Sequence, residues 1–393
     1  MFLAGTLFHG SQNSAGGIRA LTPTPIYPPN VDMVHQKRTL LVTGGAGSVG
    51  SALVEYVYRE KLADWDLRVF ELNTAANERY LRQFKKRATI IYGDLRNAEQ
   101  VSDAVRGVDA IIHLGAVIPP LADEHPALAE AVNVGGTRNI IEAMKAHTPD
   151  AFLLYASSIS VYGDRLKSPY ISVTDPLTPS LGDEYALTKM ACEKMLQESG
   201  LQNWTIFRLA AMMNTRMVQY FVPTMFHMPI ETPVEICWTI DSAVAFFNAI
   251  DCQPLRRRIF NLGGGPKMRL YYRDILVNFL KVAGIRGALL PENAFATCNF
   301  HCGFYADSQE LEDLLHFQKH NLEEFLAAAS NAHPWRRKLL EWMSPFILPI
   351  VRFFLLRMSE PLIARKQKDK KLCYRFFGTE SPVESQEVAY IVS

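Results

Sequence analysis

The sequence predicts an α/β protein, with a doubly wound parallel sheet followed by a smaller, mostly helical C-terminal lobe. Three observations support this prediction. Six short β-branched runs alternate with segments of helical period from Thr39 onwards, a glycine-rich turn follows the first run, and the alternation loosens after Leu209. Strands that alternate with helices demand a parallel sheet covered by helices on both faces.

The strands are predicted from β-branched and aromatic runs, and the helices from apolar residues at three- and four-residue intervals. The strands are expected at 39–43, 67–70, 89–92, 110–114, 152–156 and 205–209, with helices at 49–60, 98–105, 127–145 and 183–199. Beyond them, Pro223, Pro229 and Pro233 interrupt a Met- and Phe-rich stretch, as expected of a ligand-binding lobe. A late strand at 259–262 and helices at 272–283, 308–315 and 322–329 complete this lobe.

The composition describes a folded chain of balanced charge. Its 48% hydrophobic and 21% charged residues exclude global disorder. The 41 basic against 40 acidic residues leave no surplus to neutralise a phosphate backbone, so we expect no nucleic-acid partner. Six scattered cysteines indicate reduced thiols, and the first ten residues do not make a secretory signal, so we expect a cytoplasmic protein.

One close cysteine pair offers potential metal ligands. Cys298 and Cys302, with His301 between them, could give zinc three soft ligands. No second ligand pair accompanies them, so we expect ordinary thiols and no metal site.

The chain ends divide into an extension and a tail. Residues 1–38 carry Gly, Ser and a Pro cluster, which predicts a flexible N-terminal extension. In the tail, 336–393, an apolar segment at 339–356 is interrupted by Glu341, Pro345, Pro349 and Arg352, so we expect it to be too short and too broken to span a bilayer. A basic run follows at 365–371. The pair suits either a helix on a membrane surface, or a helix that closes over the lobe or contacts a second subunit.

The glycine-rich turn predicts a Rossmann-type dinucleotide site. Gly44, Gly47 and Gly50 follow the first strand and open the first helix, with Ser48 and Val49 between them. The first glycine allows a tight turn, the second lets the backbone approach a pyrophosphate, and the third lets helix and strand pack closely. The free N–H groups and positive dipole end of the helix then face the phosphates.

The end of the second strand indicates which dinucleotide is bound. Glu71 lies 27 positions beyond Gly44, where a carboxylate can accept hydrogen bonds from the adenosine ribose and repels a 2′-phosphate. The sequence therefore favours NAD over NADP. The other interpretation is a solvated acid at a strand end.

A candidate proton-transfer pair lies on a later helix. Tyr185 and Lys189 are four residues apart, so both side chains project from one face. A tyrosine with a pKa near ~10 is a poor acid or base at neutral pH, and a nearby cation stabilises its phenolate. We therefore expect Lys189, and the positive charge of an oxidised nicotinamide, to lower the pKa of Tyr185.

Three further motifs lie after the third expected strand, at the end of the fourth, and within the helix expected at 127–145. They are Gly93-Asp94-Leu95, His113-Leu114-Gly115-Ala116 and Asn133-Val-Gly-Gly-Thr137. Together with the glycine turn and the Tyr/Lys pair, these motifs resemble the extended short-chain dehydrogenase/reductase family, which includes nucleotide-sugar epimerases and 3β-hydroxysteroid dehydrogenases. The resemblance covers about 39–262. It implies an NAD-binding Rossmann domain at 39–210 and a substrate-binding lobe at 211–335.

The resemblance also implies roles for these motifs. Asp94 would face the adenine beside Leu95, and Asn133 would support the active-site backbone. Leu114, Gly115 and Ala116 would line the binding site of the cofactor.

By the same resemblance, the serine that hydrogen-bonds the reacting oxygen is Ser158, with its neighbour Ser157 as the alternative. Tyr185 would then take a proton from a substrate alcohol while hydride passes to the nicotinamide. Lys189 would hold the cofactor ribose, and the reverse reaction would reduce a ketone.

Departures from the family pattern narrow the reaction. The 4,6-dehydratases of the family carry an Asp-Glu pair where this chain has Ile159-Ser160, so we do not expect dehydration. Nucleotide-sugar epimerases place an asparagine soon after the arginine of the sixth strand, whereas none follows Arg208 until Asn214. Glu235 matches the place of a diphosphate-binding arginine, and an acid facing a diphosphate would be repulsive.

The expected substrate is largely apolar or sugar-like. An apolar stretch follows the sixth strand, and it is either pocket or plain core: Met212, Met213, Met217, Tyr220, Phe221, Met225, Phe226 and Trp238. Methionines adapt to irregular apolar ligands, which favours a lipid-like, steroid-like or aryl alcohol. We thus expect an NAD-dependent dehydrogenase or reductase, and a homodimer by resemblance. The alternatives are a nucleotide-sugar epimerase and a non-catalytic NAD-binding protein.

Overall fold

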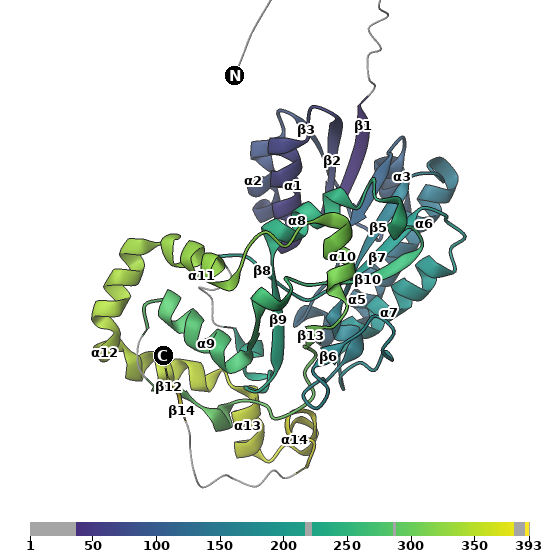
Figure 1. The fold of residues 1–393 in the computed structure, drawn as a ribbon. Coiled ribbons are helices and arrows are strands. Elements are labelled where there is room, and N and C mark those ends of the chain that lie inside the picture. The colour runs from purple at the N-terminus through teal and green to yellow at the C-terminus, as the bar shows by residue number, and fades with distance from the viewer. Residues whose placement is uncertain (1–36, 217–221, 286–287, 381–389, 393) are drawn as a thin grey trace, which may run out of the picture. The chain divides into compact units, whose positions relative to one another are not determined.

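The computed structural model describes residues 37–216, 222–285, 288–380 and 390–392. Its main element is a seven-stranded sheet whose neighbours all run parallel, in the order β10-β7-β5-β4-β1-β2-β3 (Figure 1). The strand order reverses between β1 and β4, which places a ligand crevice at their carboxyl ends. The strands are β1 Arg38–Thr43, β2 Trp65–Glu71, β3 Ala88–Tyr92, β4 Ala110–His113, β5 Phe152–Ser158, β7 Trp204–Leu209 and β10 Arg258–Leu262.

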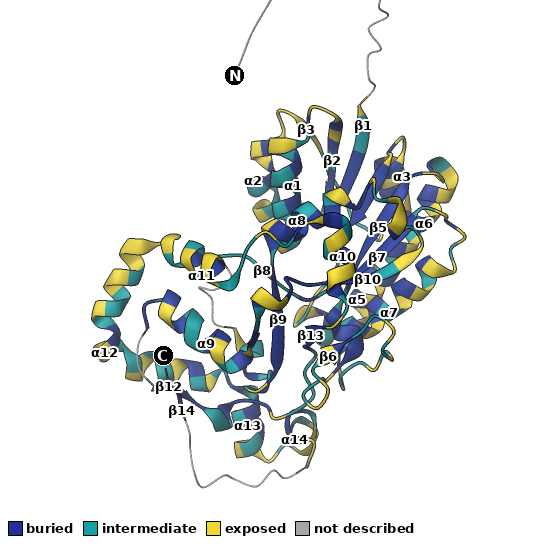
Figure 2. Ribbon diagram, in the orientation of Figure 1, coloured by how far each residue is buried: buried dark blue, intermediate teal, exposed yellow. Residues whose placement is uncertain are grey.

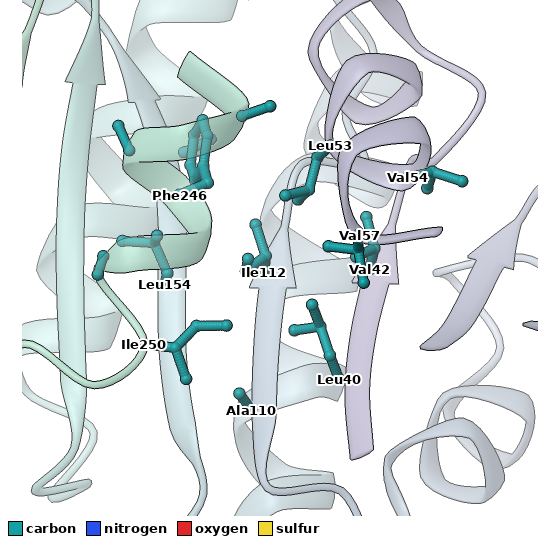
Figure 3. Packing of buried hydrophobic residues seen from close by; sticks show 14 of the residues in the cluster. Leu40, Val42, Leu53, Val54, Val57, Ala110, Ile112, Leu154, Phe246 and Ile250 are labelled. Carbon is teal, nitrogen blue, oxygen red and sulfur yellow. The ribbon is translucent and has the colours of Figure 1, made fainter. Parts of the chain in front are cut away.

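Helices cover both faces of this sheet, so the doubly wound prediction is confirmed. On one face pack α1 Ser48–Glu60, α8 Thr239–Asn248 and α10 Ser308–Leu315, and on the other α3 Ala98–Val105, α6 Gly136–His147 and α7 Glu184–Gln197. The strands are apolar on both faces: Leu40 and Val42 point to the α1 side, among the residues that Figure 3 labels, while Leu41 points to the α3 side. A short helix, α2 Ala75–Leu81, follows β2.

The C-terminal region is mostly helical and has a core of its own. This core lies between α9 Tyr272–Val282, α11 Leu322–Asn331 and a three-stranded sheet that the sequence did not predict. Pro233 begins one of its strands, a position where proline removes no needed donor. The three strands are β8 Ala211–Met213, β9 Pro233–Trp238 and β11 Arg269–Tyr271.

Two further strand pairs lie outside these two sheets. One joins β6 Tyr170–Ile171 to β13 Phe304–Tyr305, and the other joins β12 Ala288–Pro291 to β14 Tyr390–Val392. Further short helices are α4 Leu121–Glu124, which lies against α7, and, in the C-terminal region, α13 Glu360–Gln367 and α14 Lys370–Phe377.

The helix predicted at 127–145 is not uniform. It comprises α5 Pro126–Ala129, a π-helical turn at Glu130–Gly135 and then α6. A π turn widens the helix and is frequent at functional sites. Asn133 lies within this turn.

The expectation that the apolar tail segment is too broken and too short to span a bilayer is wrong. Helix α12 runs without a break from Pro334 to Arg357, over 24 residues, and contains Pro345 and Pro349. Proline fixes φ near the helical value, and both rings lie on the exposed side, where a helix can accommodate them. By length and composition alone, α12 is the one helix among the described residues that could cross a membrane.

Candidate active site

The glycine turn between β1 and α1 brings backbone segments into close approach. Gly44 has φ +72°, a conformation that favours glycine, and a Cβ there would lie 2.7 Å from the backbone nitrogen of Gly115. A Cβ on Gly50 would collide with the carbonyl oxygen of Gly44. Since α1 begins directly after Gly47, its first N–H groups open toward the turn.

Glu71 lies beside this turn, at the end of β2. Its carboxylate accepts hydrogen bonds from the backbone N–H groups of Ala46 at 2.8 Å and Leu72 at 2.9 Å, and from the Asn77 amide at 3.2 Å. These bonds hold the negative charge next to the glycine turn. The structure thus brings together the two features from which the sequence predicted a dinucleotide.

The turn after β3 carries Asp94 and Leu95. Asp94 pairs with Nη2 of Arg96 at 2.5 Å, and this hydrogen-bonded partner holds the pKa of the carboxyl below its usual value. The side chain of Leu95 packs between the end of β4 and α6. A Cβ added to Gly115 or to Gly136 would lie within 2.9 Å of it. Leu95 therefore fixes the spacing between these elements.

The end of β4 is held by a buried polar chain. The Nδ1 of His113 lies 2.7 Å from the hydroxyl of Thr43, and its Nε2 lies 3.2 Å from the hydroxyl of Thr137. Burial, and then the charge of Lys189, lower the pKa of His113 to about 3, so the ring is neutral. This chain ties β4 to β1 and to α6.

Asn133 holds the segment that follows β4. Its side-chain oxygen accepts from the Val117 N–H at 2.7 Å, and its Nδ2 donates to the Val117 carbonyl at 3.0 Å and the Thr188 hydroxyl at 3.0 Å. Asn133 is buried. Through Thr188, the residue before Lys189, it links this segment to α7.

Tyr185, Lys189 and Ser158 come together between α7 and the end of β5. Ser158 and Tyr185 line the same cavity, and the Ser158 side chain lies close enough to the phenol to oppose the rise in the pKa of Tyr185. The Nζ of Lys189 lies 5.5 Å from the centre of the Tyr185 ring and donates to the carbonyl oxygen of Ala156 at 2.6 Å. The alternative serine, Ser157, donates instead to Glu193 at 2.5 Å.

One cavity of about 340 Å³ joins these residues to the glycine turn. Its lining is Gly44, Gly47, Ser48, Val49, Gly50, Leu114, Ala116, Ile118, Ala156, Ser157, Ser158, Tyr185, Lys189, Leu209, Ala210 and Met212. Asn133, Glu71, Asp94, Leu95 and Gly115 of the predicted set lie outside this lining. Among these, Asn133 binds the backbone of Val117, and Leu95 packs against Gly115. Glu71 lies beside the glycine turn, and Asp94 follows the end of β3.

The expected lowering of the Tyr185 pKa does not hold in the protein alone. Burial raises the pKa of Tyr185 above its usual value, the charge of Asp183 adds to this, and the Ser158 side chain opposes it. Burial also lowers the pKa of Lys189 to about 8. The spacing of Tyr185 and Lys189 along the helix does not report burial, and a side chain largely removed from water loses the hydration that stabilises its charge.

The charge argument from Glu235 is also wrong. Glu235 is fully buried on β9, where it pairs with Arg269 at 2.8 Å and accepts from the backbone N–H groups of Gly265 and Tyr305. Its charge is matched by Arg269 inside the lobe, and Glu235 is not among the residues that line the cavity. Asn214, in contrast, donates to the Ser48 hydroxyl at 2.8 Å and so lies beside the glycine turn.

Within the described residues, the apolar stretch belongs mainly to the core of the lobe rather than to the cavity. Met212 lines the cavity, whereas Phe226 is fully buried, and Met213, Met225 and Trp238 pack against the lobe core. Met217, Tyr220 and Phe221 lie outside the described residues.

Sequence reasoning missed a buried ion pair that supports the site. Arg208 on β7 pairs with Glu193 on α7 at 2.7 Å, and Glu193 also accepts from Ser157. The sequence does carry a signal for this pair: Tyr185, Lys189 and Glu193 recur every four residues, so they share one helical face.

The Cys/His segment lies near the start of α7. His301 lies 2.6 Å from Asp183, and within the described ranges no three His, Cys, Asp or Glu side chains could hold a metal.

Part of the chain is similar to known proteins. Residues 40–223 match the sequence model of the NAD dependent epimerase/dehydratase family. Human 3 beta-hydroxysteroid dehydrogenase type 7 is 36% identical over 34% of this chain and 36% of its own length. The dTDP-glucose 4,6-dehydratase of Mycolicibacterium smegmatis is 34% identical over 40% of this chain and 47% of its own. The chain thus spans less than half the length of either relative.

Among solved structures, the UDP-glucose 4-epimerase of Thermus thermophilus, in complex with NAD, shares the fold with a TM-score of 0.61. It is 20% identical, and the match covers 76% of this chain and 99% of that one. At this identity the likeness concerns the fold alone.

Proposed function

Because residues 40–223 belong to the NAD dependent epimerase/dehydratase family, within the extended short-chain dehydrogenases/reductases, we propose that the chain is an NAD-dependent oxidoreductase that interconverts a secondary alcohol and a ketone. One observation carries the proposal. Ser158, Tyr185 and Lys189 line the same cavity as the glycine turn. A substrate held against Tyr185 would therefore meet the cofactor.

The residues present fit a dinucleotide. Side chains at Gly44 or Gly50 would close the backbone approach that a pyrophosphate needs, and the start of α1 offers free N–H groups to phosphate oxygens. Glu71 would hold the adenosine ribose and repel a 2′-phosphate, which favours NAD over NADP. Asp94 and Leu95 would lie toward the adenine, and Leu114 and Ala116 toward the middle of the cofactor.

The proposed proton transfer uses the chain's own groups. When bound, the nicotinamide supplies the hydride acceptor or donor. Tyr185 takes the proton from the substrate hydroxyl in the oxidative direction and returns it in the reductive one. Ser158, which lines the cavity beside Tyr185, orients the reacting oxygen, and Lys189 holds the cofactor ribose and places positive charge near the phenol.

The lining of the cavity supports an apolar substrate. Beyond Ser158, Tyr185 and Lys189, the cavity is lined by apolar side chains that donate no hydrogen bond: Ile118, Leu209, Ala210 and Met212. Such a surface favours a lipid-like, steroid-like or aryl alcohol. The similarity to a 3 beta-hydroxysteroid dehydrogenase points the same way.

A nucleotide-sugar epimerase is the second candidate. The buried ion pair of Glu235 with Arg269 removes the charge conflict that the sequence suggested, so a diphosphate meets no carboxylate from this position. A CDP-paratose 2-epimerase is 30% identical over 32% of this chain. A non-catalytic NAD-binding protein is the third.

The proposed enzyme is a homodimer and lies in the cytoplasm. All six cysteines are free in the structure, which suits a reducing compartment. Leu187, 51% exposed on the outer side of α7, is a residue that a dimer contact would bury.

The test begins with the nucleotide that co-purifies with the protein, released by denaturation and identified. Turnover of alcohols and of UDP-sugars is then followed by nicotinamide absorbance and by product analysis. A dehydrogenase changes the absorbance with an apolar alcohol, whereas an epimerase converts a UDP-sugar with no net change. If NAD binds but neither substrate class turns over, the proposal of an enzyme is wrong.

A further inference from the structure

The outward side of α12 is apolar from one end to the other. Its large apolar side chains are between 46% and 75% exposed, and Figure 2 shows exposed positions along the whole helix. We call them the α12 stripe: Trp335, Leu339, Trp342, Phe346, Ile350, Phe353 and Phe354. Their three- and four-residue spacing places them on one face, where a helix that faces water carries polar residues instead.

The opposite side of α12 already has its partner. Ser344 and Leu355 are buried, and Leu348, Val351 and Leu356 pack against the core of the lobe. The helix is thus anchored, and the stripe faces away from the described part of the chain. An exposed apolar patch of this size marks a surface that binds something else.

Positive charge surrounds the stripe. Residues 334–371 contain ten Lys or Arg against three Asp or Glu, a formal charge of +7, whereas the whole chain carries +1. The exposed cations flank both ends of the helix, with Lys338 near its start and Lys366, Lys368 and Lys371 beyond its end. The apolar face and the cations therefore lie in one segment.

We propose that α12 docks the protein on a membrane that contains anionic lipids. The helix would lie in the plane of the interface, with the α12 stripe among the acyl chains and the cations at the head groups. Aromatic side chains suit this depth, and each Lys or Arg near an anionic surface adds attraction. The proposal concerns this surface alone and is independent of the reaction.

Two other occupants fit less well. In a two-fold dimer the same patch meets itself, so segments of charge +7 would face each other and repel. A helix that spans a bilayer exposes every side to lipid or to other spanning helices, whereas one side of α12 is packed against the lobe. A lipid surface matches both the apolar face and the charge.

The experiment is vesicle flotation of the full chain. Protein is mixed with vesicles of phosphatidylcholine alone or of phosphatidylcholine with phosphatidylserine, and bound protein rises in a density gradient while aggregates sink. We expect flotation with the anionic vesicles and at least about tenfold weaker binding to the neutral ones. Bound protein should be released by an alkaline wash.

Variants separate the stripe from general hydrophobicity. The double variant Trp342→Glu/Phe346→Glu, which changes residues 73% and 75% exposed, should lose at least about tenfold in binding. The control Tyr170→Glu/Leu181→Glu, at residues 60% and 54% exposed elsewhere, should float like the unchanged chain. Equal thermal unfolding of both variants shows that folding is intact.

Three outcomes would overturn the proposal. The first is an unchanged chain that does not float with either vesicle, or a stripe variant that floats as well as it does. The second is retention after the alkaline wash, which indicates a spanning helix. The third is a dimer in light scattering that the stripe variant dissociates while flotation stays the same, which assigns the stripe to a second copy.

Discussion

The Nζ of Lys189 donates to the carbonyl oxygen of Ala156 at 2.6 Å, and this bond joins α7 to β5 at the base of the cavity. Lys189 lies one helical turn after Tyr185, and Ala156 lies two residues before Ser158. The bond therefore fixes the register of the helix against the strand. It also explains how residues from two separate motifs share one site.

The first prediction concerns the charge of Lys189. Because burial lowers the pKa of Lys189 to about 8, the side chain is charged below that pH and loses its proton above it. We expect the affinity for NAD, measured by titration calorimetry, to fall as the pH rises through about 8. In Lys189→Met the affinity should be weaker and no longer fall there. A variant that keeps the same pH dependence contradicts the role of Lys189.

The second prediction concerns the glycine turn. A Cβ at Gly50 collides with the carbonyl oxygen of Gly44, so Gly50→Ala should displace the backbone that approaches the pyrophosphate. We expect NAD binding to weaken by at least about tenfold, the loss of one charge-assisted hydrogen bond or more. The matched control is Gly135→Ala, whose Cβ would have its nearest contact at 3.9 Å. Equal loss in both variants would count against the site.

The third prediction concerns Asn133 as a positioning residue. Asn133→Ala leaves the partly buried Val117 N–H and carbonyl without their side-chain partner, so we expect the free energy of unfolding to fall by about 1–3 kcal/mol. Because the segment that follows β4 would shift, kcat should fall more than the affinity for NAD. Equal loss of kcat and NAD affinity would show that Asn133 has no separate effect on the site.

The fourth prediction concerns acid stability. Burial lowers the pKa of His113 to about 3 from 6.5, so the unfolded chain binds the proton more readily and stability is lost as the pH falls from about 6.5 toward 3. The largest slope from one such group is about 1.4 kcal/mol per pH unit. Urea unfolding across this range should show a shallower slope for His113→Asn. The exposed control His333→Asn should keep the slope of the unchanged chain.

The sequence predicted the sheet well because its signals are local. The six runs and their glycine turn became β1 to β5 and β7, with ends that moved by at most two residues, and the late run became β10. The site residues followed from motifs at strand ends, which a parallel sheet gathers at one edge. Ser158, Tyr185 and Lys189 share the cavity with the glycine turn for this reason.

The remaining features depend on tertiary contacts that no local pattern records. Glu235 looked like a ligand-facing acid until the fold placed Arg269 and two N–H groups around it. The pKa of Tyr185 is set by burial, which sequence spacing does not report. Pro345 and Pro349 looked like breaks, yet α12 continues through them on its exposed side.

The most direct test is the turnover of Tyr185→Phe with the alcohol that the screen identifies, measured beside its affinity for NAD. The variant removes the hydroxyl that moves the proton and keeps the ring that fills the cavity. We predict a fall in kcat of roughly 10²- to 10⁴-fold with NAD affinity unchanged. Turnover equal to that of the unchanged chain would contradict the assignment of Tyr185 as the proton-transfer residue.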